Sequence, residues 1–387
     1  MNAWPDLPFL DALSDTTRGN PKTPQSEYQA SGRYAVVDQG KKLVAGYTDN
    51  PDLLYGGESP VIVFGDHTRH FKYVDFPFCM GADGVKVLRP NGDWDVKFLY
   101  YYLSSLNIPS AGYSRHFKFL KEQVVPRPPI HEQRRIAAVL DHANELRAKR
   151  RQALDHLDDL TQSMLLDMFG DPAANPRGWG SVRCQDVCRR VTVGIVFQPA
   201  SYYQEAGIPA LRSLNIRPGE IVLDNVVHFS EQANETTLAK TRIWEDDVVL
   251  VRTGRPGTAA VVPGSLNGAN AIDVLITTPD KSQVDPVYLC SFFNSPAGKR
   301  IVLGQKRGQI QEHLNVGSLK AVALPLPPVA LQQEFARRVR EVDKLRATCR
   351  TSLAELDALF ASVRDRAFKG LLWTGDDRGP LTSGKAV

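Results

Sequence analysis

The chain of 387 residues carries a net charge of +4, and 42% of its residues are hydrophobic. This length allows two or three domains, each with its own core. No apolar run reaches the roughly 18 residues needed to cross a bilayer, and the start lacks the pattern of a secretory signal. The five scattered cysteines suit a reducing compartment better than a disulfide framework. We therefore expect a cytoplasmic globular protein, whose mild positive charge permits nucleic-acid binding without requiring it.

Residues 1–125 are predicted to form a first domain that mixes helices and strands. Short β-branched segments bounded by turn residues indicate strands: YAVVDQG, SPVIVFG and VKVLRP. The segment VKFLYYYLSSL (96–106) fits a buried helix better than a strand. Two loops of this domain gather basic and aromatic residues, GDHTRHFK (65–72) and GYSRHFK (112–118).

Residues 126–172 are predicted to form a long helix that follows the first domain. The segment PRPPIHEQRRIAAVLD (126–141) places prolines just before the helix, where proline is tolerated, and Gly170 and Pro172 stop it. Apolar residues recur at steps of three and four, as in a coiled-coil seam. The predicted seam comprises Ile136, Val139, Ala143, Leu146, Ala153, Leu157, Leu160 and Met164.

A second mixed domain is predicted over residues 173–324 and a second long helix over 325–373. Strands are expected in EIVLDNVVHF, DDVVLVRTG and AIDVLITT, and the loops VRTGRPGT (251–258) and GQKRGQIQEHLN (304–315) are rich in basic residues and Gln. The tail, residues 374–387, is expected to be disordered. The seam of the second helix comprises Phe335, Val339, Val342, Leu345, Cys349, Leu353, Leu356, Phe360 and Val363.

The second half of the chain repeats the first. The proline pair and helix pattern return 199 residues later (332 − 133 = 199), so that Gln133 aligns with Gln332 and Phe169 with Phe368. Upstream, GADGVKVL (81–88) resembles GANAIDVL (268–275). The chain is therefore a tandem duplication whose unit is one domain and one long helix, too long for a solenoid repeat.

The duplication predicts the architecture. At about 1.5 Å per residue, the first helix is on the order of 57 Å long, and the short linker after it puts the second domain at its far end. To bury its seam, the second helix must run back antiparallel to the first. The expected fold class is α+β: two mixed α/β domains separated by two long antiparallel helices that form a coiled coil, with a pseudo-two-fold internal repeat. Duplex DNA has matching symmetry, with half-sites about 34 to 36 Å apart.

The sequence also resembles the DNA-specificity subunits of Type I restriction-modification systems. The resemblance lies in SEYQASGRYAVVDQGKKLVAGYTDN (26–50), PPIHEQRRIAAVLD (128–141), SMLLDMFGDP (163–172) and RAFKGLLW (366–373). It implies that residues 1–125 and 173–324 are target-recognition domains, each reading one half of a split DNA site. The two domains differ in sequence, so the half-sites should differ and flank an unread spacer of fixed length.

The same resemblance implies partners for the helices. They would dock two adenine methyltransferase subunits, which recruit the restriction and translocase subunits. The implied docking residues are Glu132, Gln133, Arg134, Gln332 and Gln333. The second copy reads VALQQEF where the first reads IHEQRRI, a departure that leaves open whether the two docking surfaces are equal. The complex would use S-adenosylmethionine, ATP and Mg, but no cofactor is expected in this chain.

Base reading usually falls to Arg, Lys, Asn and Gln, and basic or hydroxyl groups bind phosphate. The four basic loops and the segment ALRSLNI (210–216) supply the candidates, although solvated loop charges, a buried His or plain turns explain several of them about as well. His67 and His70 lack a nearby carboxylate or Cys, which argues against a metal site. The candidate DNA-binding residues are His67, Arg69, His70, Tyr113, Arg115, His116, Lys118, Arg212, Asn215, Arg252, Arg255, Lys306, Arg307, Gln309 and Gln311.

Catalytic motifs are missing from the sequence. It has no Gly-rich cofactor loop with a methyltransferase motif, no P-loop and no nuclease-type carboxylate cluster. We therefore expect a non-catalytic DNA-recognition subunit. The alternatives are a coiled-coil scaffold that binds proteins rather than DNA, and an enzyme with an unrecognised DNA-modifying centre, which would turn over DNA by itself.

Overall fold

The computed structural model describes residues 4–110, 112, 114–304 and 313–373 of the chain. The chain divides into two compact units, unit 1 (residues 1–151 and 351–387) and unit 2 (residues 152–350). Both units mix helices and strands, which confirms the predicted fold class. The tail predicted to be disordered, residues 374–387, lies outside the described residues.

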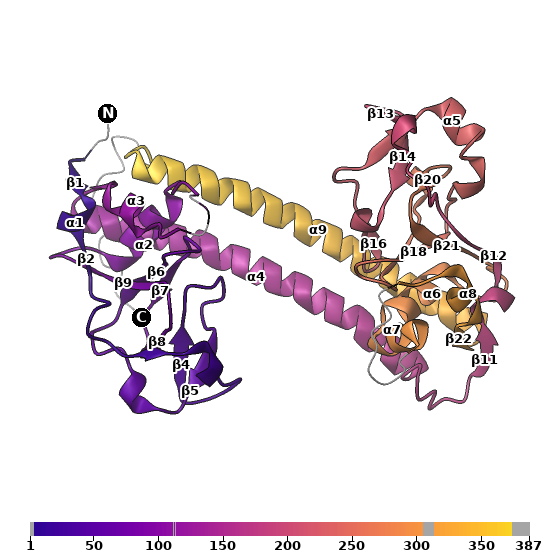
Figure 1. Cartoon of the computed structure of the whole chain (residues 1–387), viewed down its shortest axis with the longest axis horizontal. Coiled ribbons are helices and arrows are strands. Elements are labelled where there is room, and N and C mark those ends of the chain that lie inside the picture. Colours follow the sequence, from indigo (N-terminus) through magenta and orange to yellow (C-terminus); the bar gives the residue numbers. More distant parts are fainter. Residues whose placement is uncertain (1–3, 111, 113, 305–312, 374–387) are drawn as a thin grey trace, which may run out of the picture. The chain divides into compact units, whose positions relative to one another are not determined.

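Unit 1 contains two four-stranded sheets (Figure 1). The first is antiparallel, in the order β2-β9-β6-β7, and the second has the order β3-β8-β4-β5, in which β3 and β4 run parallel to β8. A two-stranded sheet pairs β1 with β10. The elements are β1 Asp6–Pro8, α1 Phe9–Ala12, β2 Leu13–Asp15, β3 Lys22–Thr23, β4 Tyr34–Val37, β5 Gly46–Thr48, β6 Val61–Gly65, β7 Phe71–Val74, β8 Phe78–Gly81, β9 Val85–Pro90, α2 Val96–Ser105, α3 Phe117–Lys121 and β10 Val124–Pro126.

The core of unit 1 joins the domain to the long helices. The predicted buried helix is α2, whose N-cap Asp95 accepts a hydrogen bond from the Phe98 N–H at 2.9 Å. It packs against β6 and β7 on one side. The same cluster includes side chains of both long helices, α4 (Ile130–Phe169) and α9 (Val329–Phe368): Ile136, Ala137, Leu140, Phe360, Ala367 and Phe368.

Unit 2 repeats this arrangement. Its sheets have the orders β12-β21-β18-β19 and β13-β17-β14-β20, and β11 pairs with β22 and β15 with β16. EIVLDNVVHF, predicted as one strand region, is two short strands (β16 and β17) separated by a turn at Asn225, which has a φ of +54°. The elements are β11 Gly180–Arg183, β12 Cys188–Val193, β13 Tyr203–Gln204, β14 Ile208–Leu211, β15 Ile216–Arg217, β16 Glu220–Ile221, β17 Val227–Phe229, α5 Glu231–Glu235, β18 Val248–Val251, β19 Ala259–Val261, β20 Asn270–Ala271, β21 Val274–Pro279, α6 Pro286–Asn294, α7 Pro296–Leu303, α8 Val316–Ala321 and β22 Ala323–Leu326.

Within each unit the long helices pack antiparallel, and the contacts obey the repeat. In unit 1, Arg147 Nε of α4 donates to Asp357 Oδ1 of α9 at 2.5 Å. In unit 2, Arg346 Nε of α9 donates to Asp158 Oδ1 of α4 at 2.9 Å. The two ion pairs are equivalent under the repeat. Arg346 corresponds to Arg147 and Asp357 to Asp158, each 199 residues further along the chain (346 − 147 = 357 − 158 = 199). The basic run RAKRR (147–151) therefore serves partly as an interhelical contact.

The predicted seams were only partly right. Phe335, Val339, Val342 and Phe360 are buried, but Leu146, Leu160 and Leu345 are exposed. A pair of helices buries a narrow stripe, so apolar residues beside it stay in solvent unless a domain covers them. Ala137 and Leu140, which the predicted seam omits, are buried because α2 and α9 cover them.

Candidate nucleic-acid interface

Three loops of unit 1 meet at one edge of its sheets. Strands β4 and β8 are parallel, so their carboxyl ends lie at the same edge of the sheet. The loops 38–42 and 82–84 begin at this edge. The loop after β6 joins them: the Asp66 N–H donates to Gly84 O at 2.7 Å, and Thr68 Oγ1 donates to Gln39 O at 2.5 Å. The His67 N–H also donates to Gln39 Oε1 at 3.3 Å.

Asp66 also connects the two candidate loops of unit 1, 65–72 and 112–118, through hydrogen bonds. Its carboxylate is buried and accepts a hydrogen bond from the Phe117 N–H, at the start of α3, at 2.7 Å. Its carbonyl oxygen accepts a hydrogen bond from the His116 N–H at 2.9 Å and lies 2.8 Å from His116 Nδ1. The structure thus brings together two loops, 65–72 and 112–118, that lie about 40 residues apart in the sequence.

The candidate residues of these loops differ in exposure. Arg69, His70, Arg115 and Lys118 are exposed, whereas His67 is half-buried. His116 is buried and its ring lies on Asp66 O, so it is not available to DNA, contrary to the prediction. A histidine in a basic loop looks the same in sequence whether it faces solvent or holds the loop. Tyr113 lies outside the described residues.

Arg69 is held in a defined position although it is exposed. Its φ of +64° lies in the left-handed region, which a non-glycine residue adopts at a cost. Its guanidinium Nη1 donates to Ile108 O at 3.0 Å. The loop therefore presents this cation in a constrained backbone conformation.

Positive charge gathers around His70. Burial and then the nearby cations Lys41, Lys72 and Arg69 lower the pKa of His70. Lys72 is buried and donates to Asp38 O at 2.7 Å. Lys41 was not among the predicted site residues. Its place in a Gly-Lys-Lys turn directly after a strand is the signal that sequence reasoning overlooked.

Unit 2 forms a comparable edge. Strands β14 and β20 are parallel, and Arg212 and residues 272–273 follow their carboxyl ends. Arg252 Nη1, after β18, donates to Asp273 Oδ1 at 2.8 Å. The two predicted loops again meet: the Leu314 N–H donates to Arg252 O at 3.0 Å, and Thr253 Oγ1 lies 3.0 Å from His313 Nδ1.

The candidates in the segment 210–216 are mostly engaged within unit 2. Asn215 is fully buried, and its amide nitrogen donates to Val222 O at 2.9 Å and Asp224 O at 3.1 Å. Its Oδ1 accepts a hydrogen bond from the Arg212 N–H at 3.0 Å, so the buried Asn215 builds a turn and is not exposed for contact with DNA, contrary to the prediction. Arg212 is half-buried and its Nη2 donates to Asn225 O at 2.5 Å.

Arg255 is the exposed cation of the loop between β18 and β19. Gly257 has a φ of +81° and closes this turn beside α7, where Lys299 lies. Burial and then the Arg255 charge lower the pKa of Lys299. Lys299 was also missed by the sequence prediction, because no pattern links α7 to that loop. The remaining candidates, Lys306, Arg307, Gln309 and Gln311, lie outside the described residues.

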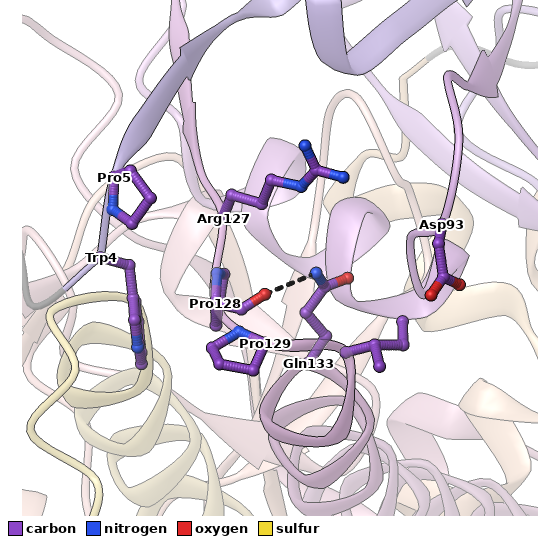
Figure 2. A pocket seen from close by; sticks show the side chains of 8 residues that line it. Trp4, Pro5, Asp93, Arg127, Pro128, Pro129 and Gln133 are labelled. Atoms are coloured by element: carbon purple, nitrogen blue, oxygen red, sulfur yellow. Dashed lines mark hydrogen bonds between the residues drawn. The ribbon is translucent and has the colours of Figure 1, made fainter.

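The predicted docking residues Gln133 and Gln332 have the same structural role in both units. In unit 1, Gln133 Oε1 accepts from the Asp95 N–H at 2.9 Å and its Nε2 donates to Pro128 O at 2.9 Å. Figure 2 shows this second bond, with Arg127 and Asp93 nearby. All three residues line an open pocket of about 490 Å³. In unit 2, Gln332 binds the Asp285 N–H and Pro327 O, both at 2.8 Å.

Gln133 and Gln332 are therefore not available for docking. Both are buried, and both join the proline turn before a long helix to the N-cap of a domain helix, α2 or α6. Glu132 is largely buried and pairs with Arg135 at 3.3 Å. Arg134 and Gln333 are exposed and remain candidates for partner contact.

The described residues contain neither a metal-binding cluster nor a membrane-spanning helix. No cluster of three or more His, Cys, Asp or Glu side chains there is arranged to hold a metal ion. Nor does any helix among them combine the length and apolar character required to span a membrane.

Comparison with known proteins finds that the chain is similar to DNA-specificity subunits of restriction systems. Residues 13–156 match the family described as Type I restriction modification DNA specificity domain. The Type I restriction enzyme EcoBI specificity subunit of Escherichia coli is 23% identical over 318 residues, which are 72% of this chain and 66% of that protein. The EcoKI specificity subunit of Escherichia coli (strain K12) is 23% identical over 274 residues, 64% of this chain and 57% of that protein.

The chain thus spans less than two thirds of the length of these curated relatives. A similar fold is seen in the crystal structure of the Type-I restriction-modification system S subunit from M. genitalium. It aligns with a TM-score of 0.58 over 96% of both chains at 14% identity. At this identity the alignment supports the fold.

Proposed function

We propose that this chain is a specificity subunit of a Type I restriction-modification system and that it recognises a bipartite DNA sequence; its similarity to such subunits supports this. Each unit would read one half-site, and the bases between the half-sites would go unread. The chain would act in the cytoplasm as the DNA-recognition part of a larger complex.

One observation carries this proposal. In both units, two loops that are distant in sequence are bonded together at one sheet edge and present exposed cations, Arg69 and His70 in unit 1 and Arg255 in unit 2. Phosphate contacts from such cations supply most of the affinity for DNA, and Arg is the commonest reader of guanine. Solvated loop charges without function would not need hydrogen bonds that hold the loops together in both copies.

The two edges differ in their residues, which supports two different half-sites. In unit 1 the exposed residues of the two loops that Asp66 joins are Arg69, His70, Arg115 and Lys118. In unit 2 Arg252 forms an ion pair with Asp273, and Arg255 is exposed. Because the side chains differ at matching loops, the preferred bases should differ as well. We therefore propose an asymmetric recognition sequence.

The long helices would dock two adenine methyltransferase subunits, one on each unit. Exposed leucines occur at matching positions of the repeat: Leu146 and Leu345 are 39% and 57% exposed, and Leu160 and Leu359 are 44% and 54% exposed. Each unit thus holds one member of each pair. Repeated apolar residues in solvent support two similar protein contacts. The restriction and translocase subunits would join through the methyltransferases.

The chain itself would be non-catalytic. The methyl donor S-adenosylmethionine, ATP and Mg would be bound by the partner subunits. In this scheme, the methyltransferases each flip one adenine near a half-site that this chain has positioned. The purified chain, incubated with DNA and either S-adenosylmethionine or ATP, should give no turnover.

Single-molecule methylome sequencing of cells with and without the gene tests the function. We expect methylated adenines in a gapped, asymmetric motif only when the gene is present. If no motif depends on the gene and the chain binds DNA without sequence preference in the presence of its partners, the protein-binding scaffold is the better explanation.

A further inference from the structure

Lys41 and Lys299 lie against the candidate DNA-reading loops. Lys41 belongs to the loop after β4, two residues from Gln39. Gln39 accepts hydrogen bonds from Thr68 Oγ1 at 2.5 Å and from the His67 N–H at 3.3 Å. The loop of Lys41 is therefore packed on the loop that presents Arg69.

Lys299 lies beside the corresponding arginine loop in unit 2, although on a different element, helix α7. A Cβ atom built on Gly257 would lie 4.0 Å from Lys299 Cγ and 3.8 Å from Val302 Cγ1, so the turn that carries Arg255 rests directly on α7. The first turn of α7 is capped by Ser295, whose Oγ accepts a hydrogen bond from the Gly298 N–H at 2.9 Å. Lys299 is thus fixed at the side of the loop by a capped, packed helix.

Neither lysine, nor the arginine beside it, pairs with a carboxylate among the described residues, although the nearby Lys72 pairs with Asp38. Like charges this close repel each other, and a bound anion removes that repulsion. Burial, and after it the charges of the nearby cations, lowers the pKa of His70, beside Lys41, and the pKa of Lys299, beside Arg255. The ion pairs formed among the described residues include none of the following four: Lys41, Arg69, Arg255 and Lys299.

We propose that Lys41 and Lys299 each bind a backbone phosphate of DNA, while the neighbouring arginine, Arg69 or Arg255, contacts the bases. Lysine suits this role, because its ammonium group is a compact point charge without the planar fork that reads guanine. The arginines are exposed on the loops beside these lysines. This inference rests on the proposed function and assigns separate roles to residues of the same site.

Salt dependence separates phosphate contacts from base contacts. The full chain in complex with its methyltransferase subunits is titrated with the methylated motif and with duplexes altered in one half-site, between about 50 and 200 mM salt. Lys41→Gln and Lys299→Gln should each reduce the slope of log K against log salt by about 0.9 and weaken all duplexes by one common factor. Arg69→Gln and Arg255→Gln should instead reduce discrimination, each at a single half-site.

Two lysines whose ammonium groups already bind carboxylates serve as matched controls. Lys369, 2.8 Å from Asp365 in unit 1, and Lys281, paired with Asp246 in unit 2, are changed to Gln and should leave the slope unaltered. Thermal unfolding confirms that all variants are folded. An unaltered slope in Lys41→Gln and Lys299→Gln would overturn the inference, as would loss of discrimination at a half-site in those variants. A wild-type complex without any sequence preference would instead reject the proposed function.

Discussion

Asp66 shows how one buried residue organises a recognition loop. Its backbone N–H binds one segment, at Gly84, and its carbonyl and carboxylate bind a second, at His116 and Phe117. Loops have few apolar contacts, so such hydrogen bonds decide their conformation. The exposed cations of unit 1 can be held in place only because polar groups beneath them are satisfied within the chain.

At the same scale, DNA binding should depend on pH through His70. Burial and the nearby cations Lys41, Lys72 and Arg69 lower its pKa from the usual 6.5, so the ring is neutral in the free protein at pH 7. A phosphate beside it favours the protonated ring, and DNA affinity should therefore rise as the pH falls from about 7.5 to 5.5. If bound DNA raises the pKa of His70 by one pH unit, the affinity for DNA at low pH should increase about tenfold.

Fluorescence anisotropy across this pH range measures the effect, with His70→Gln expected to have a flatter profile.

The stability of the fold should change with pH in the opposite direction to the affinity for DNA. Below pH 6.5 the unfolded chain takes up the proton before the folded chain does, so acidification lowers the stability until the folded-state pKa is passed. An equal pH profile in His70→Gln would assign the dependence to another group.

At the scale of elements, the joint between each domain and its long helix is built in the same way twice. Gln133 and Gln332 each accept a hydrogen bond from the N–H of a helix N-cap and donate to a proline carbonyl, with distances of 2.8 to 2.9 Å. The two halves differ at most other positions, yet this joint is retained. In each unit, one glutamine side chain thus satisfies both a backbone N–H and a backbone carbonyl at the joint.

Replacing either glutamine by the similarly shaped Met should destabilise the protein. Gln133→Met or Gln332→Met leaves a buried N–H and a buried carbonyl unpaired, at a cost of about 1–3 kcal/mol for each unsatisfied group. Gln152→Met, at an exposed position of α4, is the matched control and should stay within about 0.5 kcal/mol of the wild type. Denaturant unfolding measures these differences, and equal stability of all three variants would show that the joint is dispensable.

At the scale of the whole molecule, α4 and α9 are shared by the two units, and the ion pairs Arg147–Asp357 and Arg346–Asp158 follow one antiparallel register. The proposed function then links helix length to the spacer of the DNA site. A change in one helix alone would break this register, so both helices must change together.

Inserting four residues, about one helical turn, after Arg151 and again after Arg350 should lengthen the unread spacer. The added length is about 6 Å, or roughly two base pairs. The bases recognised in each half-site should stay the same, because neither recognition edge is touched. Methylome sequencing reads out both properties, and a change in the recognised bases with an unchanged spacer would contradict this role of the helices.

The sequence by itself determined the duplication, the two long helices, their antiparallel packing and the resemblance to specificity subunits. These follow from local periodicity, from prolines and glycines at helix ends, and from a repeat that forces equal structures. Only the tertiary structure decided which polar residues face solvent. His116, Asn215, Gln133 and Gln332 read as binding residues but are buried, whereas Lys41 and Lys299 were overlooked. Burial and charge crowding depend on contacts between segments far apart in the chain, which no local pattern records.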